Sequence, residues 1–173
     1  MKLHVVLYEP EIPQNTGNIA RTCVGFNIVL HLIRPYGFIL SNKKLQRAGV
    51  DYWKYLDLHQ HNCWNDFLKT LSNKDCLYFF TRYGKKNLAA IKKVKKNYKN
   101  IYLVFGKEST GIPKKILLNN IANCLRIPTS KNIRALNVSN CVAIGAYHFM
   151  QILNFPKLEK LEPHKIDYLG INV

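Results

Sequence analysis

The stretch RIPTSKNIRALNVSN, residues 126–140, gathers polar side chains in one connector between a predicted strand and a predicted helix. It contains Pro128 but no glycine, so a simple turn does not account for its composition. Its hydroxyl, amide and guanidinium groups, with the backbone amides between them, could bind a polar ligand. The composition of this connector therefore predicts a binding loop.

The segment EPEIPQNTGNIARTC, residues 9–23, offers a cation on a predicted helix. Asn15 or Thr16 could cap that helix, whose apolar residues recur at helical spacing. The apolar stripe would consist of Ile19, Cys23 and Phe26. Arg21 then lies on a polar face, where its guanidinium could bind a phosphate or a carboxylate through two parallel hydrogen bonds. The alternative is that Arg21 is a solvated or ion-paired surface residue.

The segment LVFGKESTGIP, residues 103–113, partly matches the phosphate-binding loop G-x-x-x-x-G-K-[ST]. The match fails because Ile112 and Pro113 stand where a lysine and a hydroxyl residue would bind phosphate and magnesium. Gly106, at the end of a predicted strand, still allows a ligand to approach the backbone closely. Glu108 is one of only 10 acidic residues, and it could either pair with a cation or fix a loop or a ligand.

Charge and size limit the class of protein and its partners. The 173 residues carry 26 Lys and Arg against 10 Asp and Glu, a net charge of +16, which attracts phosphate backbones. Nucleic acid is the first candidate partner, although a general bias toward Lys, Asn and Ile would raise the charge as well. No apolar run approaches the ~20 residues that span a bilayer, and KLHVVLY after Met1 does not resemble a secretory signal. We expect a cytoplasmic protein with no membrane partner.

The cysteines and histidines do not predict a metal site. The five cysteines are odd in number and never spaced as CxxC, so we expect reduced core residues rather than disulfides or zinc ligands. They are Cys23, Cys63, Cys76, Cys124 and Cys141. His59 and His61 lack a second ligand cluster, and we interpret them as solvent-facing strand residues.

Alternating strands and helices along the whole chain predict an α/β fold around a mainly parallel sheet. The predicted strands cover residues 2–8, 28–33, 55–61, 75–81, 100–105 and 123–128. The predicted helices cover about ten residues after the first strand, then 43–48, 62–72, 114–121 and 138–153. Ligands of such sheets bind at the carboxyl ends of the strands, where the polar loops of this chain lie. We expect one domain over residues 1–155 and a tail over 156–173, with the tail and the Lys-rich segment 85–99 as candidate flexible regions.

The three segments quoted above resemble the three ordered motifs of the SPOUT methyltransferases, most closely the TrmL group of tRNA wobble-nucleotide 2'-O-methyltransferases. The third motif extends to RIPTSKNIRALNVSNCVAIGAY, and LHLIRPYGF and QRAGVDYW also resemble that group, so the likeness covers about residues 2–153. The resemblance implies the SPOUT alpha/beta-knot fold: a mainly parallel sheet with helices on both faces and a C-terminal trefoil knot. It also implies a homodimer.

The resemblance implies an activity as well. A methyl group would pass from S-adenosyl-L-methionine, without a metal, to the ribose 2'-hydroxyl of the wobble cytidine or uridine in the tRNA anticodon stem-loop. Arg21 and Asn15 match the family's catalytic positions. The residues that match the cofactor-binding loops are Phe80, Thr81, Gly106, Glu108, Ile127, Ala135, Leu136 and Asn137, of which Glu108 and Asn137 shape the second and third loops. The polar connector 126–140 would then form part of a cofactor cradle.

The chain departs from the family pattern in three places. Ala135 stands where relatives commonly have serine, the segment 85–99 is more basic than expected, and AYHFMQ lacks the acid that usually follows the tyrosine. Two alternatives therefore stay open: a SPOUT 2'-O-methyltransferase of ribosomal RNA, and a non-catalytic RNA-binding module with a degenerate cofactor pocket. Tyr83, Tyr98 and the lysines of 85–99 could contact RNA by stacking and phosphate binding, or they could form a solvated face.

Overall fold

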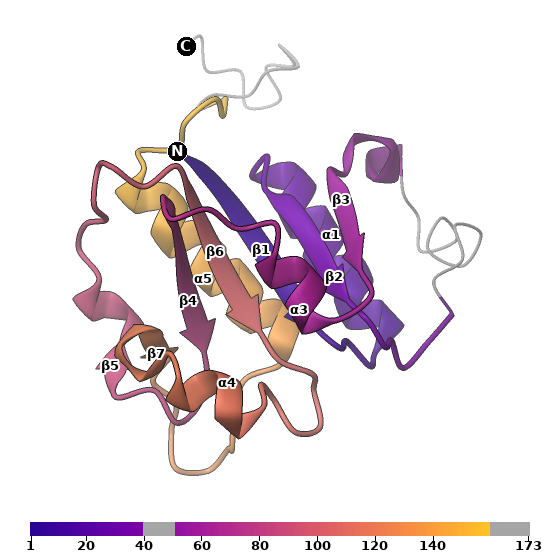
Figure 1. Cartoon of the computed structure of the whole chain (residues 1–173), viewed down its shortest axis with the longest axis vertical. Coiled ribbons are helices and arrows are strands. Elements are labelled where there is room, and N and C mark those ends of the chain that lie inside the picture. Colours follow the sequence, from indigo (N-terminus) through magenta and orange to yellow (C-terminus); the bar gives the residue numbers. More distant parts are fainter. Residues whose placement is uncertain (40–50, 160–173) are drawn as a thin grey trace, which may run out of the picture.

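A single seven-stranded sheet organises the chain in the computed structural model, which describes residues 1–39 and 51–159. The strands are β1 (Lys2–Tyr8), β2 (Val29–Ile33), β3 (Leu58–His61), β4 (Asp75–Phe80), β5 (Lys86–Asn87), β6 (Asn100–Phe105) and β7 (Cys124–Arg126). They pair in the order β3-β2-β1-β6-β4-β7-β5, and every pair is parallel (Figure 1). This confirms the predicted α/β class and the parallel sheet.

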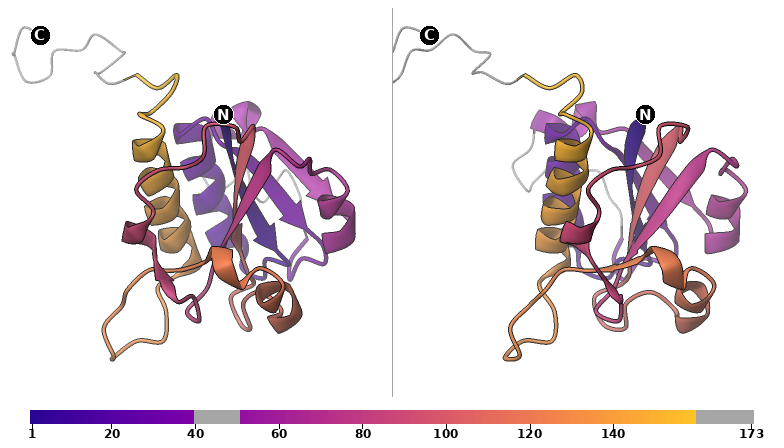
Figure 2. Two further views of the ribbon diagram at one scale, coloured as in Figure 1. Left: turned by 60° about the vertical axis from the view of Figure 1, so that its left-hand side comes forward. Right: turned by 90° about the vertical axis from the view of Figure 1, so that its left-hand side faces the viewer.

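Helices cover both faces of the sheet. The helices are α1 (Pro13–Gly25), α3 (Trp64–Leu68), α4 (Lys114–Leu118) and α5 (Val138–Ile152), and short 3-10 turns are η1 (Asp51–Tyr55), η2 (Leu88–Ala90) and η3 (Ile121–Asn123). Figure 2 shows α1 and α5 on one side of the sheet and α3 and α4 on the other. Helices on both faces are therefore confirmed.

The central strands are buried on both faces, which explains their continuous apolar sequence. Leu3, Val5 and Leu7 of β1 pack in one core with residues of α1 and α5. Val6 points to the opposite face and packs in a second core that includes Phe67 of α3. Two cores separated by one sheet give the three-layer arrangement that positions the strand ends.

Most predicted elements agree with the structure, and the clearest differences concern the lengths of helices. The edge strand expected over 55–61 is β3, at one end of the sheet, and the helices expected over 62–72 and 114–121 are only five residues each. The segment 43–48 lies outside the described residues, as does most of the tail. The Lys-rich segment contributes β5 and η2. The trefoil knot and the domain boundary stay predictions.

The start of α1 differs from the prediction. The helix begins at Pro13 with Ile12 at the N-cap and no side-chain cap, because proline at the first helical position already fixes the required backbone angle. Asn15 and Thr16 are therefore not caps. They lie inside the first turns and are buried, which frees the Asn15 side chain for contacts with other loops.

Three of the five cysteines, Cys23, Cys76 and Cys124, are buried free thiols, as predicted, and burial raises the pKa of the Cys23 thiol. Cys63 is exposed, so the prediction of a core position was wrong for it. It directly precedes α3 as the N-cap residue, before the helix begins to pack on the sheet. Among the described residues, no helix has both the length and the apolarity needed to cross a membrane.

A row of histidines crosses three neighbouring strands. Nδ1 of His4 on β1 lies 2.9 Å from Nε2 of His31 on β2, and Nδ1 of His31 lies 2.9 Å from Nε2 of His61 on β3. His59 is exposed as predicted, but His61 is half-buried beside Phe67, with 5.3 Å between ring centroids. The solvent-facing interpretation was wrong for His61 because α3 covers its side of the edge strand.

Candidate active site

A chain of hydrogen bonds joins three loops at the carboxyl ends of the strands. Asn15 Nδ2 donates to Glu108 Oε1 at 2.9 Å, and Asn137 Nδ2 donates to Asn15 Oδ1 at 3.0 Å. The second oxygen of Glu108 accepts the backbone N–H of Glu11 at 2.9 Å. These contacts fix the loop after β1, the loop after β6 and the start of α5 relative to one another.

Asn137 also ends the loop before α5. Its Oδ1 accepts the backbone N–H of Ser139 at 2.8 Å, so the side chain caps the helix while its amide group holds Asn15. A side-chain cap satisfies one of the free N–H groups of the first turn. The segment that precedes α5 therefore enters the helix in one defined orientation.

Further polar contacts clamp the loop after β6 to the loop after β1. Glu11 accepts hydrogen bonds from the hydroxyl and the backbone N–H of Ser109 at 2.8 and 2.9 Å, and the hydroxyl contact above all lowers the pKa of the Glu11 carboxyl. Lys107 Nζ donates to Glu9 Oε2 at 2.9 Å, which raises the pKa of Lys107. Arg134 reaches the Ser109 carbonyl at 3.3 Å. The two loops thus form one rigid wall.

These loops enclose a cavity of about 290 Å³ at the carboxyl ends of β4, β6 and β7. The predicted site residues that line it are Asn15, Phe80, Thr81, Gly106, Glu108, Ile127, Ala135, Leu136 and Asn137. Eight expected cofactor residues and Asn15 therefore meet in one place, although they come from four separate parts of the chain.

The cavity is lined by aromatic side chains and by a closely packed glycine loop. Phe80 and Phe105 stack with 4.5 Å between ring centroids and 20° between planes. A Cβ on Gly106 would lie 2.2 Å from the carbonyl carbon of Gly111, so only glycine allows this close approach of two backbone segments. Apolar walls beside backbone hydrogen-bonding groups suit a flat heteroaromatic ring with polar edges. The residues present therefore fit the adenosine part of the expected methyl donor.

Several lining residues were not among the site residues predicted individually, although some lie in the predicted binding loop 126–140. They are Ile12, Arg82, Tyr83, Phe105, Lys107, Thr110, Gly111, Ile112, Leu125, Arg126, Thr129, Arg134, Val138 and Cys141. Most lie in or beside the polar loops that follow the strands, so the signal that could have found them was their place at strand ends. The clamp between Glu11 and Ser109 has no comparable signal, because it depends on two loops 98 residues apart.

The chain does not bring Arg21 into its own cavity. Arg21 is exposed on α1, six residues after Asn15, which corresponds to about 9 Å along the helix axis. Its guanidinium carbon lies 5.9 Å from the ring centroid of Tyr52, whose hydroxyl donates to the Gly17 carbonyl at 3.0 Å. The guanidinium is thus placed on the outer face of α1, away from the lining residues.

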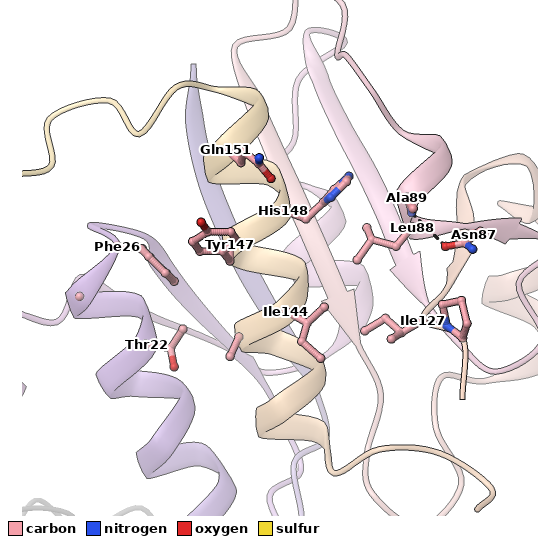
Figure 3. A pocket seen from close by; sticks show the side chains of 13 residues that line it. Thr22, Phe26, Asn87, Leu88, Ala89, Ile127, Ile144, Tyr147, His148 and Gln151 are labelled. Atoms are coloured by element: carbon pink, nitrogen blue, oxygen red, sulfur yellow. Dashed lines mark hydrogen bonds between the residues drawn. The ribbon is translucent and has the colours of Figure 1, made fainter. Parts of the chain in front are cut away.

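A second, larger hollow of about 830 Å³ lies along α5, with the end of α1 on one flank of that helix and η2 and Ile127 on the other (Figure 3). Phe26 and Tyr147 face each other across it, with 6.4 Å between ring centroids. Ile144 and Tyr147 are 42% and 52% exposed, which is high for large apolar side chains. The opposite stripe of α5 is buried in the core and includes Val142, Ala146, Phe149 and Met150. One side of α5 therefore serves the core, and the other presents an uncovered apolar surface.

Comparison with known proteins decides the family. The SpoU rRNA Methylase family matches residues 2–147. The chain belongs to this family. It is 46% identical to the "Putative tRNA (cytidine(34)-2'-O)-methyltransferase" of Geobacillus stearothermophilus, over 90% of this chain and 98% of that protein. A solved structure concerned with the 2-OH methylation of C/U34 on tRNA superposes with a TM-score of 0.80, at 40% identity, over 88% of this chain and 97% of that one.

Other SpoU proteins share the fold at much lower identity. The SpoU methyltransferase AviRb from Streptomyces viridochromogenes was solved in complex with the cofactor AdoMet. It superposes with a TM-score of 0.72 at 15% identity, over 87% of this chain and 57% of AviRb. At 15% identity, this likeness supports a shared fold alone. SpoU methyltransferases use AdoMet, which is S-adenosylmethionine.

Proposed function

We propose that this SpoU protein transfers a methyl group from S-adenosylmethionine to the ribose 2'-hydroxyl of the wobble cytidine or uridine in tRNA. The observation that carries the proposal is the cavity in which Asn15 meets all eight residues expected to bind the donor. Two relatives support the proposal. The Geobacillus stearothermophilus protein is 46% identical and the solved structure concerned with C/U34 methylation is 40% identical. Such a protein would work in the cytoplasm, where tRNA is modified.

The donor would be held by backbone and apolar groups of three loops. Phe80 and Thr81, Gly106, and the segment from Ile127 to Asn137 would surround it, with Glu108 fixing the second loop. When bound, S-adenosylmethionine supplies a methyl group that is already activated on a positively charged sulfur. The chain then needs to orient the acceptor oxygen in line with that methyl group, so positioning is its main catalytic task.

Arg21 would stabilise the acceptor. A ribose 2'-hydroxyl is a weak nucleophile, and a fixed cation beside it stabilises the negative charge that grows as its proton leaves. A guanidinium with a pKa above about 12 is a poor proton acceptor. We therefore assign Arg21 to positioning and charge stabilisation, with a phosphate of the substrate or a water molecule taking the proton.

A homodimer would bring Arg21 to a cavity. Arg21 lies on the outer face of α1, next to Thr22, which lines the apolar hollow between α1 and α5. If the hollow of each protomer is buried against the other protomer, the outer face of α1 that carries Arg21 can approach the cavity of the partner. The exposed Ile144 and Tyr147 support this arrangement because burial of such side chains favours association.

Replacement of Arg21 by lysine tests its assigned role. Arg21→Lys keeps the positive charge and loses the planar fork, so turnover should fall at least tenfold while donor affinity is retained. Isothermal titration with S-adenosylmethionine and single-turnover methylation rates measure the two quantities. Nearly full turnover of Arg21→Lys would exclude a bidentate contact.

Two alternatives are separable by experiment. The matched family is named for ribosomal RNA, which favours a second candidate acceptor, and Ala135 in place of serine keeps a non-catalytic RNA-binding module open. Methylation assays with total tRNA and with ribosomal RNA distinguish the acceptors. Titration with S-adenosylmethionine distinguishes enzyme from module, because a module would bind tRNA without binding the donor.

A further inference from the structure

We infer that Arg82, Tyr83, Lys85 and Arg126 form a binding surface for a single RNA strand at the mouth of the cavity. These four residues are the Tyr83 surface. The inference rests on the proposed function only for the identity of the RNA as an anticodon stem-loop. The chemistry that the surface recognises is an unpaired base next to a phosphodiester.

The turn that carries the Tyr83 surface is held rigidly. The backbone N–H of Gly84 donates to the Thr81 carbonyl at 3.1 Å, and the backbone N–H of Tyr83 donates to the Thr81 hydroxyl at 3.3 Å. A Cβ on Gly84 would lie 2.6 Å from the carbonyl carbon of Leu125, so this turn packs directly on the backbone of β7. The side chains of the turn therefore project from a fixed base.

Tyr83 presents an aromatic ring at this mouth. It is 63% exposed although it lines the cavity. The guanidinium carbon of Arg82 lies 4.5 Å from its ring centroid, and Arg82 also donates a hydrogen bond to the Tyr83 hydroxyl. Stacked aromatic and guanidinium groups are the platforms on which unpaired RNA bases stack. One open ring with a cation against it is suited to a splayed nucleotide.

A polar hollow of about 230 Å³ lies beside the turn. Its lining residues are Gly84, Lys85, Asn87, Arg126, Pro128 and Thr129. Arg126 and Thr129 also line the main cavity, so the hollow and the cavity share one edge. Two cations with an amide and a hydroxyl make a site for a phosphate oxygen.

Within residues 1–39 and 51–159, the cations of the Tyr83 surface form no ion pair. Within the described parts of the chain, the ion pairs involve Lys2, His59, Lys69 and Lys107. Nζ of Lys86 donates a hydrogen bond to the Ala122 carbonyl at 2.8 Å, and Lys86 does not line the hollow. Lys85 does line it. The carboxylate of Glu108 in the cavity already accepts two hydrogen bonds. A polyanion near this mouth therefore meets uncompensated positive charge.

The test is RNA affinity in the absence of methyl donor, so that donor binding cannot influence the result. Fluorescence anisotropy with a labelled anticodon stem-loop RNA is measured at several salt concentrations. Lys85→Ala and Arg126→Ala should each flatten the plot of log affinity against log salt by about 0.7, the value for one phosphate contact on a single strand. Tyr83→Ala should weaken binding roughly 5- to 100-fold at unchanged slope, and Tyr83→Phe should retain affinity because the ring is kept.

Matched controls come from the same chain. Lys74→Ala removes a cation that precedes β4, at the end of the strand opposite to the turn. Tyr55→Ala removes an equally exposed tyrosine that also has a cation over its ring, Lys54 at 5.0 Å. Both controls should bind the RNA with wild-type affinity and slope.

The outcomes separate this inference from the proposed function. Wild-type binding by Lys85→Ala and Tyr83→Ala would overturn the Tyr83 surface, even if the protein methylates tRNA. Absence of RNA binding by the wild-type protein would overturn it as well. Loss of affinity in these variants, with a wild-type protein that binds RNA but transfers no methyl group, would support the surface and reject the enzyme.

Discussion

Asn15 is the residue on which the geometry of the cavity depends most. It is 6% exposed, and its side chain bridges Glu108 and Asn137 through both of its polar atoms. Asn15→Ala removes two hydrogen bonds, one of them to the half-buried carboxylate of Glu108, which should lower the free energy of unfolding by about 1–3 kcal/mol. Urea denaturation measures this loss.

Asn18 provides the matched control for Asn15 on the same helix. Its side chain is exposed, so Asn18→Ala should change stability by less than about 0.5 kcal/mol. Donor affinity should fall with Asn15→Ala alone, because two of the three loops lose their common contact. Equal stability of the two variants would show that the bridge does not hold the loops.

At the scale of single residues, motifs predicted which side chains meet but not how they meet. The segments around Asn15, Glu108 and Asn137 were each recognisable in the sequence, and the structure places these side chains in mutual contact. The predicted cap at Asn15 was wrong because local helix rules do not include a partner 93 residues away. Arg21 is not among the residues that line the described cavity, so its predicted role depends on the proposed dimer.

At the scale of elements, the histidine row makes the three strands β1, β2 and β3 sensitive to pH. Burial is the main cause that lowers the pKa of His4 to about 4 and that of His31 to about 3, and burial also lowers the pKa of His61. Tyr102 stacks on His4 with 4.3 Å between ring centroids, and Phe67 packs edge-on to His31. These rings are neutral in the folded protein at neutral pH.

The unfolding free energy should therefore fall as the pH drops from 7 to 5. Unfolded histidines bind protons below about pH 6.5, whereas the folded His4 and His31 do so only near pH 4 and 3. In this window the unfolded state binds more protons, and each of the two histidines contributes up to about 1.4 kcal/mol per pH unit. Urea denaturation at several pH values gives the slope.

Substitution of one histidine isolates this effect. His31→Leu removes one buried titrating group, so its stability should depend less steeply on pH between 7 and 5. Leu32→Val, at a buried position of β2 that carries no titrating group, should keep the wild-type slope. The carboxyls of Glu11 and Asp57 have lowered pKa values and titrate below this window. A His31→Leu slope equal to that of the wild type would mean that the row is not the cause.

The elements themselves were predictable where burial imposes a simple pattern. β1 and β6 have the predicted bounds, because strands buried on both faces are continuous apolar runs that end at polar loops. α5 matches within one residue, because its apolar residues recur at helical spacing. β5 escaped prediction because it has only two residues, and its pairing with β7 depends on tertiary contact.

At the scale of the whole molecule, the apolar hollow between α1 and α5 predicts self-association. Ile144→Glu places a charge on that surface and should convert a dimer into a monomer in sedimentation equilibrium. Leu118→Glu, at a still more exposed apolar residue on the opposite face of the sheet, should leave the dimer intact. A wild-type protein that is monomeric at micromolar concentration would contradict this assignment.

Mixed dimers test whether Arg21 serves the cavity of the partner. Arg21→Ala retains an intact cavity, whereas Gly106→Ala forces a Cβ to within 2.2 Å of the Gly111 backbone and should abolish donor binding. Each variant alone should be inactive. After the two are mixed and allowed to exchange subunits, one complete site per mixed dimer should restore activity. No recovery would place Arg21 and the cavity in the same protomer.

Whole-molecule features were the least accessible to sequence reasoning from periodicity. The predictions of a dimer and a knot came from the family resemblance alone, since neither leaves a mark in strand or helix patterns. The all-parallel sheet was different, because alternation of strands with helices already favours parallel connections.

The central claim is that the methyl group reaches the ribose of nucleotide 34 in tRNA. The most direct test is to incubate the wild-type protein with S-adenosylmethionine and unmodified tRNA, digest the RNA, and map the added mass by mass spectrometry. The account predicts a single 2'-O-methylated cytidine or uridine at position 34, and none with Arg21→Ala. A methyl group on a base, at another position, or only on ribosomal RNA would contradict it.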